Sequence, residues 1–502
     1  MLPLFNHQKE GVNFIVKKGG VGALFWEMGT GKTRATIETL KRIRETDPKV
    51  KMLVIAPISL LEAAWGDDIK RFSNFNYWNL RKTEAEREDE DTDIFGINYE
   101  ALLSKKNIDQ IKFVISGYGA QGYSFMAVLD ESSKIKNHQT QITKLLLKMT
   151  NLFKYRIVMT GTPAANSEME YWPQMQFAVP GSLGTSMTVF KNYFFHLRKG
   201  SDSQSIPVFM PKQIAHQMFK SGWKYEITPA KREELMRLIL PHVHLAKKKD
   251  CLDLPDQIDE IREVEMAPDQ ARAYREMEKQ LVTEIQNQQI AAPLAITKLM
   301  KLRQISSGFV YSDNGEALEI SNDGGNYPER ISETPKIIVK QEFSNPKLRE
   351  LFDIIEEAGD QPIMIWINFH WEQIKICHEL HSRFPDQVVT LSSLTKDKDE
   401  SIRAFQEGRA RFLVAHPASA AHGLTFVNCA LQIFFSLDFS WEKYEQARAR
   451  IHRAGQKNNC TYVHILAKNT IDRHILDVLR KKGDAQDLVY RIVSEYRKET
   501  KC

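Results

Sequence analysis

Short runs of apolar residues recur along the first third of the chain, each followed by a proline, an acidic residue or a glycine-containing turn. They cover Lys51–Pro57, Phe125–Leu129 and Arg156–Met159. Stretches of mixed polar and apolar residues separate them, as in a chain of alternating strands and helices. Because strands that are apolar on both sides are buried on both faces, the pattern predicts a parallel sheet covered by helices.

Apolar runs of the same kind return in the last third of the chain. They cover Ile363–Ile367, Phe412–Ala415, Leu431–Phe435 and Thr461–Ile465. Because the two sets of runs are far apart in the sequence, we expect two sheets and therefore two α/β lobes.

The stretch between the two sets has a different pattern. It is charged and rich in Met and Gln, and Asp269–Gln289 is typical of a helix. Asp313-Asn-Gly315 lies between two short apolar runs and indicates a β-hairpin, whereas Ser321–Pro328 has the composition of a linker. The predicted division is a first lobe over residues 1–180, helical insertions with the hairpin and the linker over 181–335, and a second lobe over 336–502.

Composition and charge narrow the class of protein. A chain of 502 residues is too long for one ordinary core, and 42% hydrophobic with 26% charged residues is a globular composition. The net charge of +5 is too small to argue for or against nucleic acid, and the acidic run Glu84–Asp93 is most simply a solvated loop. The five cysteines include no C-x-x-C pair, so we expect reduced thiols without zinc. With no apolar run of membrane-spanning length and no signal peptide, an intracellular protein is expected.

A glycine-rich segment follows the first apolar strand. Glu27–Thr33 lies between the apolar Val21–Phe25 and a helix-like stretch that begins at Arg34. Glycines let main-chain N–H groups approach phosphate oxygens, and a helix amino terminus adds partial positive charge. In such a loop Lys32 neutralises the β- and γ-phosphates, and the Thr33 hydroxyl ligates Mg²⁺. The predicted nucleotide-binding residues of the segment are Gly29, Thr30, Gly31, Lys32 and Thr33.

The segment departs from the strict phosphate-binding pattern at Trp26, where the pattern has glycine. Taken alone, it could be only a glycine-rich turn. The pair Asp130-Glu131 favours the nucleotide interpretation over that of a surface charge pair, because it ends an apolar strand, where open α/β sheets bind ligands. We expect Asp130 to hold the Mg²⁺ shell, and Glu131 to orient and deprotonate the attacking water.

Hydrolysis also needs positive charge near the γ-phosphate. Gln446–Arg453 offers Arg450 and Arg453, which are three residues apart and would share one face of a helix. Arginines that reach a phosphate from another lobe act as arginine fingers. The alternative is a basic helix that only faces solvent.

Several segments carry further motifs in a fixed order. They are Leu4–Gly11 (a glutamine motif), Ile55–Leu61 followed by Trp65 (motif Ia), Ile97–Glu100 (a strand-contacting motif), Val128–Asn137 (motif II), Thr160–Asn166 (motif III), Ile365–Phe369 (motif IV) and Gln446–Gln456 (motif VI). Together with the glycine-rich segment Glu27–Thr33 (motif I) they resemble the Swi/Snf-type branch of helicase superfamily two, over most of the chain. The resemblance implies two tandem RecA-like lobes that couple ATP hydrolysis to movement on DNA.

Two motifs depart from the family pattern. Ser132 and Ser133 of motif II stand where relatives have alanine and histidine, so coupling through that histidine cannot be carried over. Ser419–Phe426, at motif V, lacks the common Gly-Ile-Asn-Leu ending and is more similar to the fork-remodelling, or annealing-helicase, members. No segment resembles a histone-reading module. We therefore expect a phage or bacterial form of the motor, a monomer in the cytoplasm of a bacterium or an infected host.

The resemblance implies roles for single residues. Gln8 reads adenine, Gln446 contacts the nucleotide, and Thr160 and Thr162 couple the nucleotide to the DNA track. ATP and Mg²⁺ are the implied cofactors, and duplex or branched DNA is the implied partner. Contacts with DNA phosphates, which hold register without reading sequence, are implied for Ser59, Asn98, Tyr99, Asn368 and Ser419.

Three functions compete. The first is a duplex translocase that remodels branched DNA by branch migration or fork reversal, and the second is a conventional strand-separating helicase. The third is an ATP-switched factor that displaces proteins or binds DNA, against which the complete motifs I, II and VI argue.

Energetics favour the first function over the second. Unwinding one base-pair step loses about 1.4 kcal/mol of stacking on average, whereas exchanging one duplex for another is nearly balanced. The Asn314-Gly315 hairpin could be a strand-separating wedge, but Asp313 and Glu316 at its tip would be repelled by phosphate, so structural packing is the favoured role. Branched-DNA remodelling is therefore the predicted activity.

Overall fold

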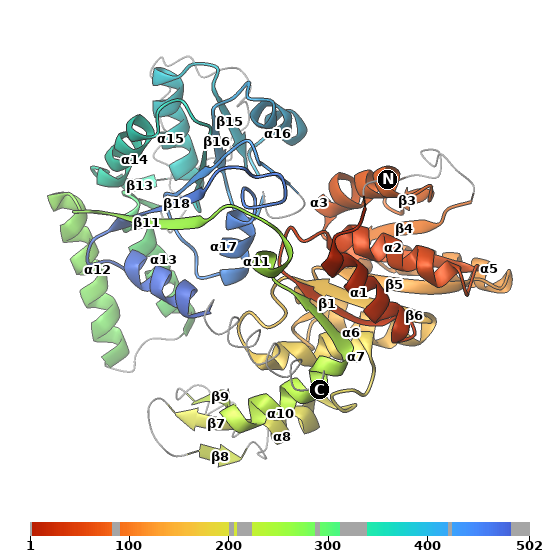
Figure 1. Cartoon of the computed structure of the whole chain (residues 1–502). Coiled ribbons are helices and arrows are strands. Elements are labelled where there is room, and N and C mark those ends of the chain that lie inside the picture. The colour runs from red at the N-terminus through yellow and green to blue at the C-terminus, as the bar shows by residue number, and fades with distance from the viewer. Residues whose placement is uncertain are drawn as a thin grey trace. The chain divides into compact units, whose positions relative to one another are not determined.

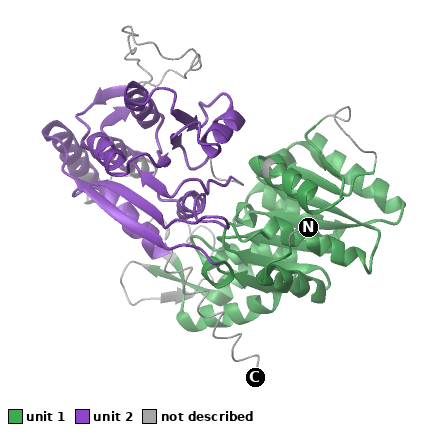
Figure 2. Cartoon of the chain, turned by 45° about the horizontal axis from the view of Figure 1, so that its top comes forward, with its two compact units in different colours: residues 1–252, 484–502 green, residues 253–483 purple. Residues whose placement is uncertain are grey.

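The computed structural model describes residues 3–82, 91–199, 205–207, 223–286, 292–311, 339–419 and 424–482. The chain forms two compact units, one within residues 1–252 and one within residues 253–483 (Figure 2). Each unit has a parallel sheet with helices on its faces (Figure 1). The predicted fold class of two α/β lobes is thus confirmed. Within the described ranges no helix is both long and apolar enough to cross a membrane.

The first unit is built on a sheet of seven parallel strands in the order β10-β1-β6-β5-β2-β4-β3. The apolar runs of the first third form β2, β5 and β6, as predicted, and lie side by side in the middle of the sheet. Because all strands are parallel, the segments after β1, β2, β4, β5 and β6 leave from one edge. The strands are β1 (Val21–Trp26), β2 (Val50–Ala56), β3 (Tyr77–Asn79), β4 (Ile94–Asn98), β5 (Ser124–Asp130), β6 (Tyr155–Thr160) and β10 (Val243–Ala246).

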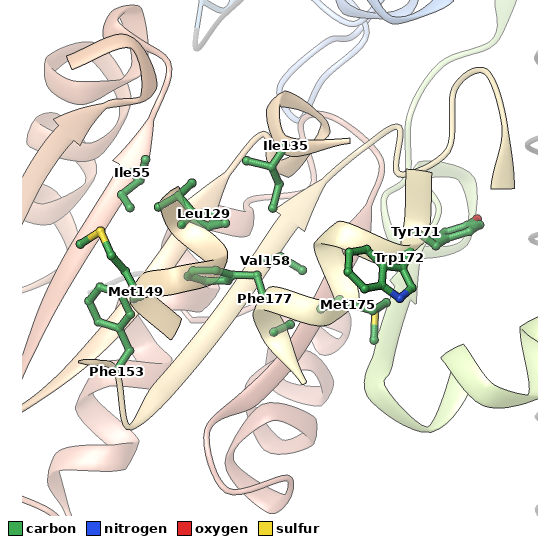
Figure 3. Packing of buried hydrophobic residues seen from close by; sticks show 14 of the residues in the cluster. Ile55, Leu129, Ile135, Met149, Phe153, Val158, Tyr171, Trp172, Met175 and Phe177 are labelled. Carbon is green, nitrogen blue, oxygen red and sulfur yellow. The ribbon is translucent and has the colours of Figure 1, made fainter. Parts of the chain in front are cut away.

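Alternate side chains of these strands enter two apolar layers. On β5, Phe125, Ala127 and Leu129 belong to one buried cluster, and Met126 and Val128 to the other. Figure 3 shows the first layer, in which side chains of β5 and β6 pack with those of α6 and α7. The helices that cover this first layer are α5 (Lys105–Ala120), α6 (Gln141–Met149), α7 (Tyr171–Ala178), α8 (Met187–Phe194) and α10 (Pro229–Ile239). The helices that cover the second layer are α1 (Asn6–Lys17), α2 (Lys32–Arg44), α3 (Ile58–Leu60) and α4 (Asp67–Phe72).

The second unit repeats this plan with six parallel strands in the order β11-β18-β17-β14-β16-β15. The apolar runs of the last third form β14, β16, β17 and β18, as predicted. The strands are β11 (Gln257–Val264), β14 (Ile363–Trp366), β15 (Val388–Leu391), β16 (Phe412–Ala415), β17 (Leu431–Phe434) and β18 (Cys460–Ala467). The helices are α12 (Pro268–Gln286), α13 (Ala292–Ser306), α14 (Pro346–Glu357), α15 (His370–Arg383), α16 (Lys398–Gln406), α17 (Trp441–Arg448) and a last helix over 471–482.

The predicted intermediate segment, residues 181–335, is divided between the two units. Its strand β10 pairs with β1 in the first sheet, and β11 pairs with β18 in the second. The chain passes from one unit to the other at residues 252 and 253. The boundaries predicted at 180 and 335 differ from those of the sheets. β10 has only four residues and β11 is mostly polar and charged, so neither strand stands out by hydrophobicity. The first unit also gains a small antiparallel sheet of β7 (Phe195–Lys199), β8 (Ser205–Pro207) and β9 (Trp223–Ile227).

The predicted hairpin at Asp313–Gly315 and the predicted linker at Ser321–Pro328 lie outside the described residues. The first strand of that hairpin is present as β12 (Phe309–Tyr311). It pairs antiparallel with β13 (Val339–Glu342), which the sequence pattern did not identify.

The carboxyl end of the acidic run is not simply a solvated loop. Asp91 forms an ion pair with Lys51, whose side chain is buried in β2, and Asp93 forms one with Arg44. Both acidic residues precede β4 and hold its start against β2 and α2. Residues 83–90 of the run lie outside the described ranges.

Candidate nucleotide site and the surrounding motifs

The glycine-rich segment forms a loop between β1 and α2. Gly29 and Gly31 have φ of 83° and 78°, a left-handed conformation that favours glycine. A side chain at Gly31 would also be blocked, because a Cβ there would lie 2.2 Å from Gln8 Nε2. Lys32 begins α2, and its ammonium group donates to the Trp26 carbonyl at 3.0 Å. The loop and the lysine thus have the arrangement expected for phosphate binding.

The glutamine motif braces this loop from α1. Gln8 Nε2 lies 3.3 Å from the carbonyl oxygens of Thr30 and Gly31, and it donates to both. His7 Nε2 lies 2.8 Å from the same Thr30 oxygen. The adenine-reading role of Gln8 stays a prediction, but its position next to the loop connects the glutamine motif with motif I.

Trp26 stands where the strict pattern has glycine because β1 extends through this position into the core. Its indole Nε1 donates to His244 Nδ1 of β10 at 2.9 Å, and its ring packs on Gly11 of α1. Only the main-chain carbonyl of Trp26 takes part in the loop, as the acceptor for Lys32. The tryptophan side chain therefore points away from the glycine-rich loop and leaves its main-chain conformation unaffected.

Asp130 ends β5 as a buried carboxylate with three identified neighbours. It accepts from Trp65 Nε1 at 2.9 Å and from the Glu131 main-chain N–H at 3.0 Å. Burial raises the pKa of Asp130, while the Lys32 charge and these two hydrogen bonds act in the opposite direction. A buried carboxylate and the Thr33 hydroxyl are hard oxygen donors, so the two predicted ligands fit Mg²⁺ chemically. A divalent cation would hold Asp130 deprotonated against the effect of burial.

Glu131 follows in a conformation that few residues other than glycine adopt. Its φ of 51° lies in the left-handed region, and its side chain is buried. The Thr160 hydroxyl at the end of β6 donates to Glu131 Oε2 at 3.2 Å and accepts from the Thr162 main-chain N–H at 3.1 Å. The structure thus brings Glu131 together with both predicted coupling residues.

The predicted DNA contacts of the first unit are placed unequally. Ser59 of α3 is exposed, as a phosphate contact requires. Tyr99, by contrast, is 1% exposed and donates its hydroxyl to the Asp130 carbonyl at 2.9 Å. Asn98 is also buried, and its side chain donates to Glu100. A phosphate contact through the Tyr99 hydroxyl does not fit this placement, because that hydroxyl already supports motif II.

In the second unit, Arg450 and Arg453 lie beyond the helix that was predicted to carry them. α17 ends at Arg448, after which the Arg450 main-chain N–H donates to the Ala447 carbonyl at 3.1 Å, one residue nearer than in an α-helix, and the Arg450 carbonyl accepts from the Phe426 N–H. Arg450 is 2% exposed and donates to the carbonyls of Gln446 and Leu424. Arg453 is half-buried and donates to the Thr425 hydroxyl at 2.9 Å. Both side chains therefore hold motif V.

The other predicted site residues of the second unit differ in burial and in hydrogen bonding. Gln446 is buried, and among the described residues no hydrogen-bond partner reaches its Nε2. The side-chain amide of Asn368 donates to the carbonyl of Ser436 at 2.9 Å, so it connects the segment after β14 with the segment after β17. Ser419 is half-buried at the start of motif V, whose residues 420–423 lie outside the description.

Three side chains near the site have roles that the sequence did not reveal. Trp65 lies in a π-helical segment, Leu61–Gly66, and holds Asp130. His244 accepts from Trp26, and the buried Gln174 accepts from Ser132. For Gln174 the only signal is a polar residue in the largely apolar α7, and the same helix also contains Gln176. Sequence alone cannot tell which of the two glutamines is buried.

The two parallel-sheet units and the phosphate-binding loop define an ATP-hydrolysing enzyme of the helicase class. The SNF2-related domain model matches residues 7–308, and the helicase conserved C-terminal domain model matches residues 346–455. The chain belongs to the SNF2-related family. The resemblance identified from the motifs is thereby confirmed.

Proteins that match most of this chain differ in their own length. Putative protein p41 of Acyrthosiphon pisum secondary endosymbiont phage 1 is 27% identical, over 92% of each chain. An uncharacterized ATP-dependent helicase of Mycoplasma genitalium is 24% identical over 98% of this chain but only 42% of its own length. The solved Sulfolobus solfataricus SWI2/SNF2 ATPase core in complex with dsDNA is 24% identical, with a TM-score of 0.42 over 98% of this chain and 93% of that one.

Proposed function

We propose that this chain is an ATP-dependent DNA translocase that remodels branched DNA by branch migration or fork reversal. The observation that supports coupled movement best is the hydrogen bond from Thr160 to Glu131. It ties the carboxylate proposed to activate water to the segment that resembles motif III. A carboxylate held in this way changes orientation when that segment moves, which is the physical requirement for coupling hydrolysis to a track.

Each group of the first unit has a role in the proposed hydrolysis. Lys32 neutralises charge on the β- and γ-phosphates, and Glu131 orients the attacking water and accepts its proton. Asp130 and Thr33 are the residues that would hold Mg²⁺, which supplies charge neutralisation at the phosphates when bound. Arg450 and Arg453 are proposed to stabilise the charge that develops on the γ-phosphate.

The choice of branched DNA rests on energetics and on motif V. Exchange of one duplex for another is nearly balanced, so a motor that moves duplex DNA through a junction does little net work per step. The ending of motif V, Gly423-Leu-Thr-Phe426, is similar to that of fork-remodelling relatives. The proposed contacts are with phosphates, so little base specificity and marked salt dependence are expected. The Mycoplasma relative named an ATP-dependent helicase fits this class of activity.

The test compares forks and four-way junctions with a simple tailed duplex at matched arm lengths and identical salt. We expect junctions and forks to be processed at ATP concentrations where the tailed duplex is barely unwound, and annealed product to accumulate. Lys32→Ala is the control for ATP dependence. If tailed duplexes are unwound as fast as junctions move, the enzyme is a conventional helicase and the proposal fails.

A further inference from the structure

A buried glutamine connects motif II with motif III in the first unit. Gln174 lies on α7 among apolar residues and is 0% exposed. Its Oε1 accepts from the Ser132 hydroxyl at 2.7 Å, and its Nε2 donates to the Pro163 carbonyl at 2.6 Å and to the Glu170 carbonyl at 2.8 Å. Every hydrogen-bonding atom of the side chain is therefore paired, which fixes its orientation.

The bridge joins two segments that both lie next to Glu131. Ser132 directly follows Glu131, and Pro163 closes the segment Thr160–Pro163. The same two segments are joined a second time by the hydrogen bond from Thr160 to Glu131. The segment 160–163 thus holds the side chain of Glu131 directly and that of Ser132 through Gln174, so two adjacent residues of motif II depend on its position.

The bridge needs the hydroxyl of Ser132 as its donor, which an apolar side chain at this position could not supply. The segment 160–163 also holds Thr162, a residue that is 2% exposed and whose hydroxyl has no hydrogen-bond partner among the described residues.

We propose that Gln174 is a positioning residue that transmits DNA engagement from the segment 160–163 to Glu131. The inference rests on the proposed function, because it requires that DNA accelerates ATP hydrolysis. Gln174 contacts neither the nucleotide nor the reacting water in this assignment. Its effect reaches Glu131 through Ser132 and the peptide bond between them.

The test measures ATP turnover without DNA and with saturating duplex DNA for Gln174→Met, which keeps the length of the side chain but removes both hydrogen-bonding groups. We expect basal turnover to stay within about twofold of wild type, while DNA-stimulated turnover falls about tenfold, a typical strength for coupling between sites. The DNA concentration for half-maximal stimulation should be unchanged. Gln176→Met is the matched control, because Gln176 lies on the same helix, is half-buried and, among the described residues, accepts one hydrogen bond, from the Gly181 N–H.

The double variant Ser132→Ala with Gln174→Met separates coupling from packing. Gln174→Met leaves the buried Ser132 hydroxyl without its acceptor, and Ser132→Ala removes that hydroxyl. We therefore expect the double variant to have a higher Tm than Gln174→Met alone. Stimulation by DNA should stay low. Recovery of stimulation together with Tm, or an equal fall of basal and stimulated turnover in Gln174→Met, would overturn the coupling role. Wild-type stimulation retained in Gln174→Met would do the same, whereas a wild-type enzyme that DNA does not stimulate would refute the proposed function as well.

Discussion

Asp130 in the first unit and Arg450 in the second are both ionisable and buried, but their partners differ in kind. Asp130 is surrounded by groups from other motifs, namely the Trp65 indole and the charge of Lys32. Arg450 donates to main-chain carbonyls, those of Gln446 and Leu424, within its own unit. The first arrangement tunes a charge for chemistry, whereas the second also fixes the backbone of motif V. Changes at the two places should therefore affect turnover and stability in different proportions.

The largest effect on chemistry is expected at the phosphate-binding loop. Lys32→Ala should lower ATP turnover by more than about a hundredfold, because charge stabilisation at a transferred phosphate is among the largest catalytic contributions. Stability should fall by about 2 kcal/mol, because two hydrogen bonds to carbonyls and the attraction between Lys32 and the buried Asp130 carboxyl are lost. The ATP turnover of the purified variant measures the first effect, and its Tm measures the second. More than about a tenth of wild-type turnover in a folded variant would refute the motif I assignment.

A second variant separates binding from hydrolysis in the same unit. Glu131→Gln keeps the size of the side chain and an oxygen that can accept from Thr160, but it removes the base. We expect ATP to bind with nearly unchanged affinity while hydrolysis almost stops, and the protein to stay longer on DNA. Fluorescent-nucleotide binding and single-turnover hydrolysis distinguish the two steps. Loss of nucleotide binding would make Glu131 a structural or metal-site residue.

The arginines of the second unit sharpen the comparison. Arg450→Ala should lower both turnover and stability, the latter by about 2 kcal/mol, because it leaves the Leu424 carbonyl without its buried donor. Arg453→Ala should lower turnover with less loss of stability, since its side chain is half-buried. Both should change nucleotide affinity less than turnover, as groups that engage the transition state do. Wild-type turnover in both variants would show that the segment is only a basic surface.

The smallest expected effect is a pH dependence of stability with opposite sign in the two units. Burial raises the pKa of Asp68 on α4 to about 6, so the folded state holds a proton that the unfolded state has lost between pH 4 and 6. Stability from this group therefore falls as pH rises through that window. Burial lowers the pKa of His464 on β18 to about 4, so the unfolded state binds the extra proton below pH 6.5, and stability falls as pH decreases.

The Tm of each variant and of the wild type, measured from pH 4 to 7, tests both predicted pH dependences. Asp68→Asn should gain relative stability as pH rises, and His464→Gln should gain relative stability as pH falls. Parallel curves for a variant and wild type would show that its residue does not titrate differently on folding.

The strongly apolar strands and the order of the motifs could be predicted from the sequence, because burial on both faces leaves a continuous hydrophobic run. β11 was missed because Gln257–Val264 has an apolar residue only at every third position, with charged residues between, which is not the alternating pattern of a strand. The identities of the loop, the acid pair and the arginines also follow from motif spacing. The buried positions of Tyr99 and Gln174 do not, because they depend on which elements pack together in three dimensions.

The central claim is that DNA controls ATP hydrolysis, and the rate of ATP turnover tests it most directly. The measurement compares the wild-type protein without DNA, with single-stranded DNA and with duplex DNA of equal length, at one salt concentration and with Lys32→Ala as background. We predict strong stimulation by duplex and weaker stimulation by the single strand. Equal turnover in all three conditions would contradict the claim that this ATPase is a DNA motor, and stronger stimulation by single strands would contradict duplex translocation.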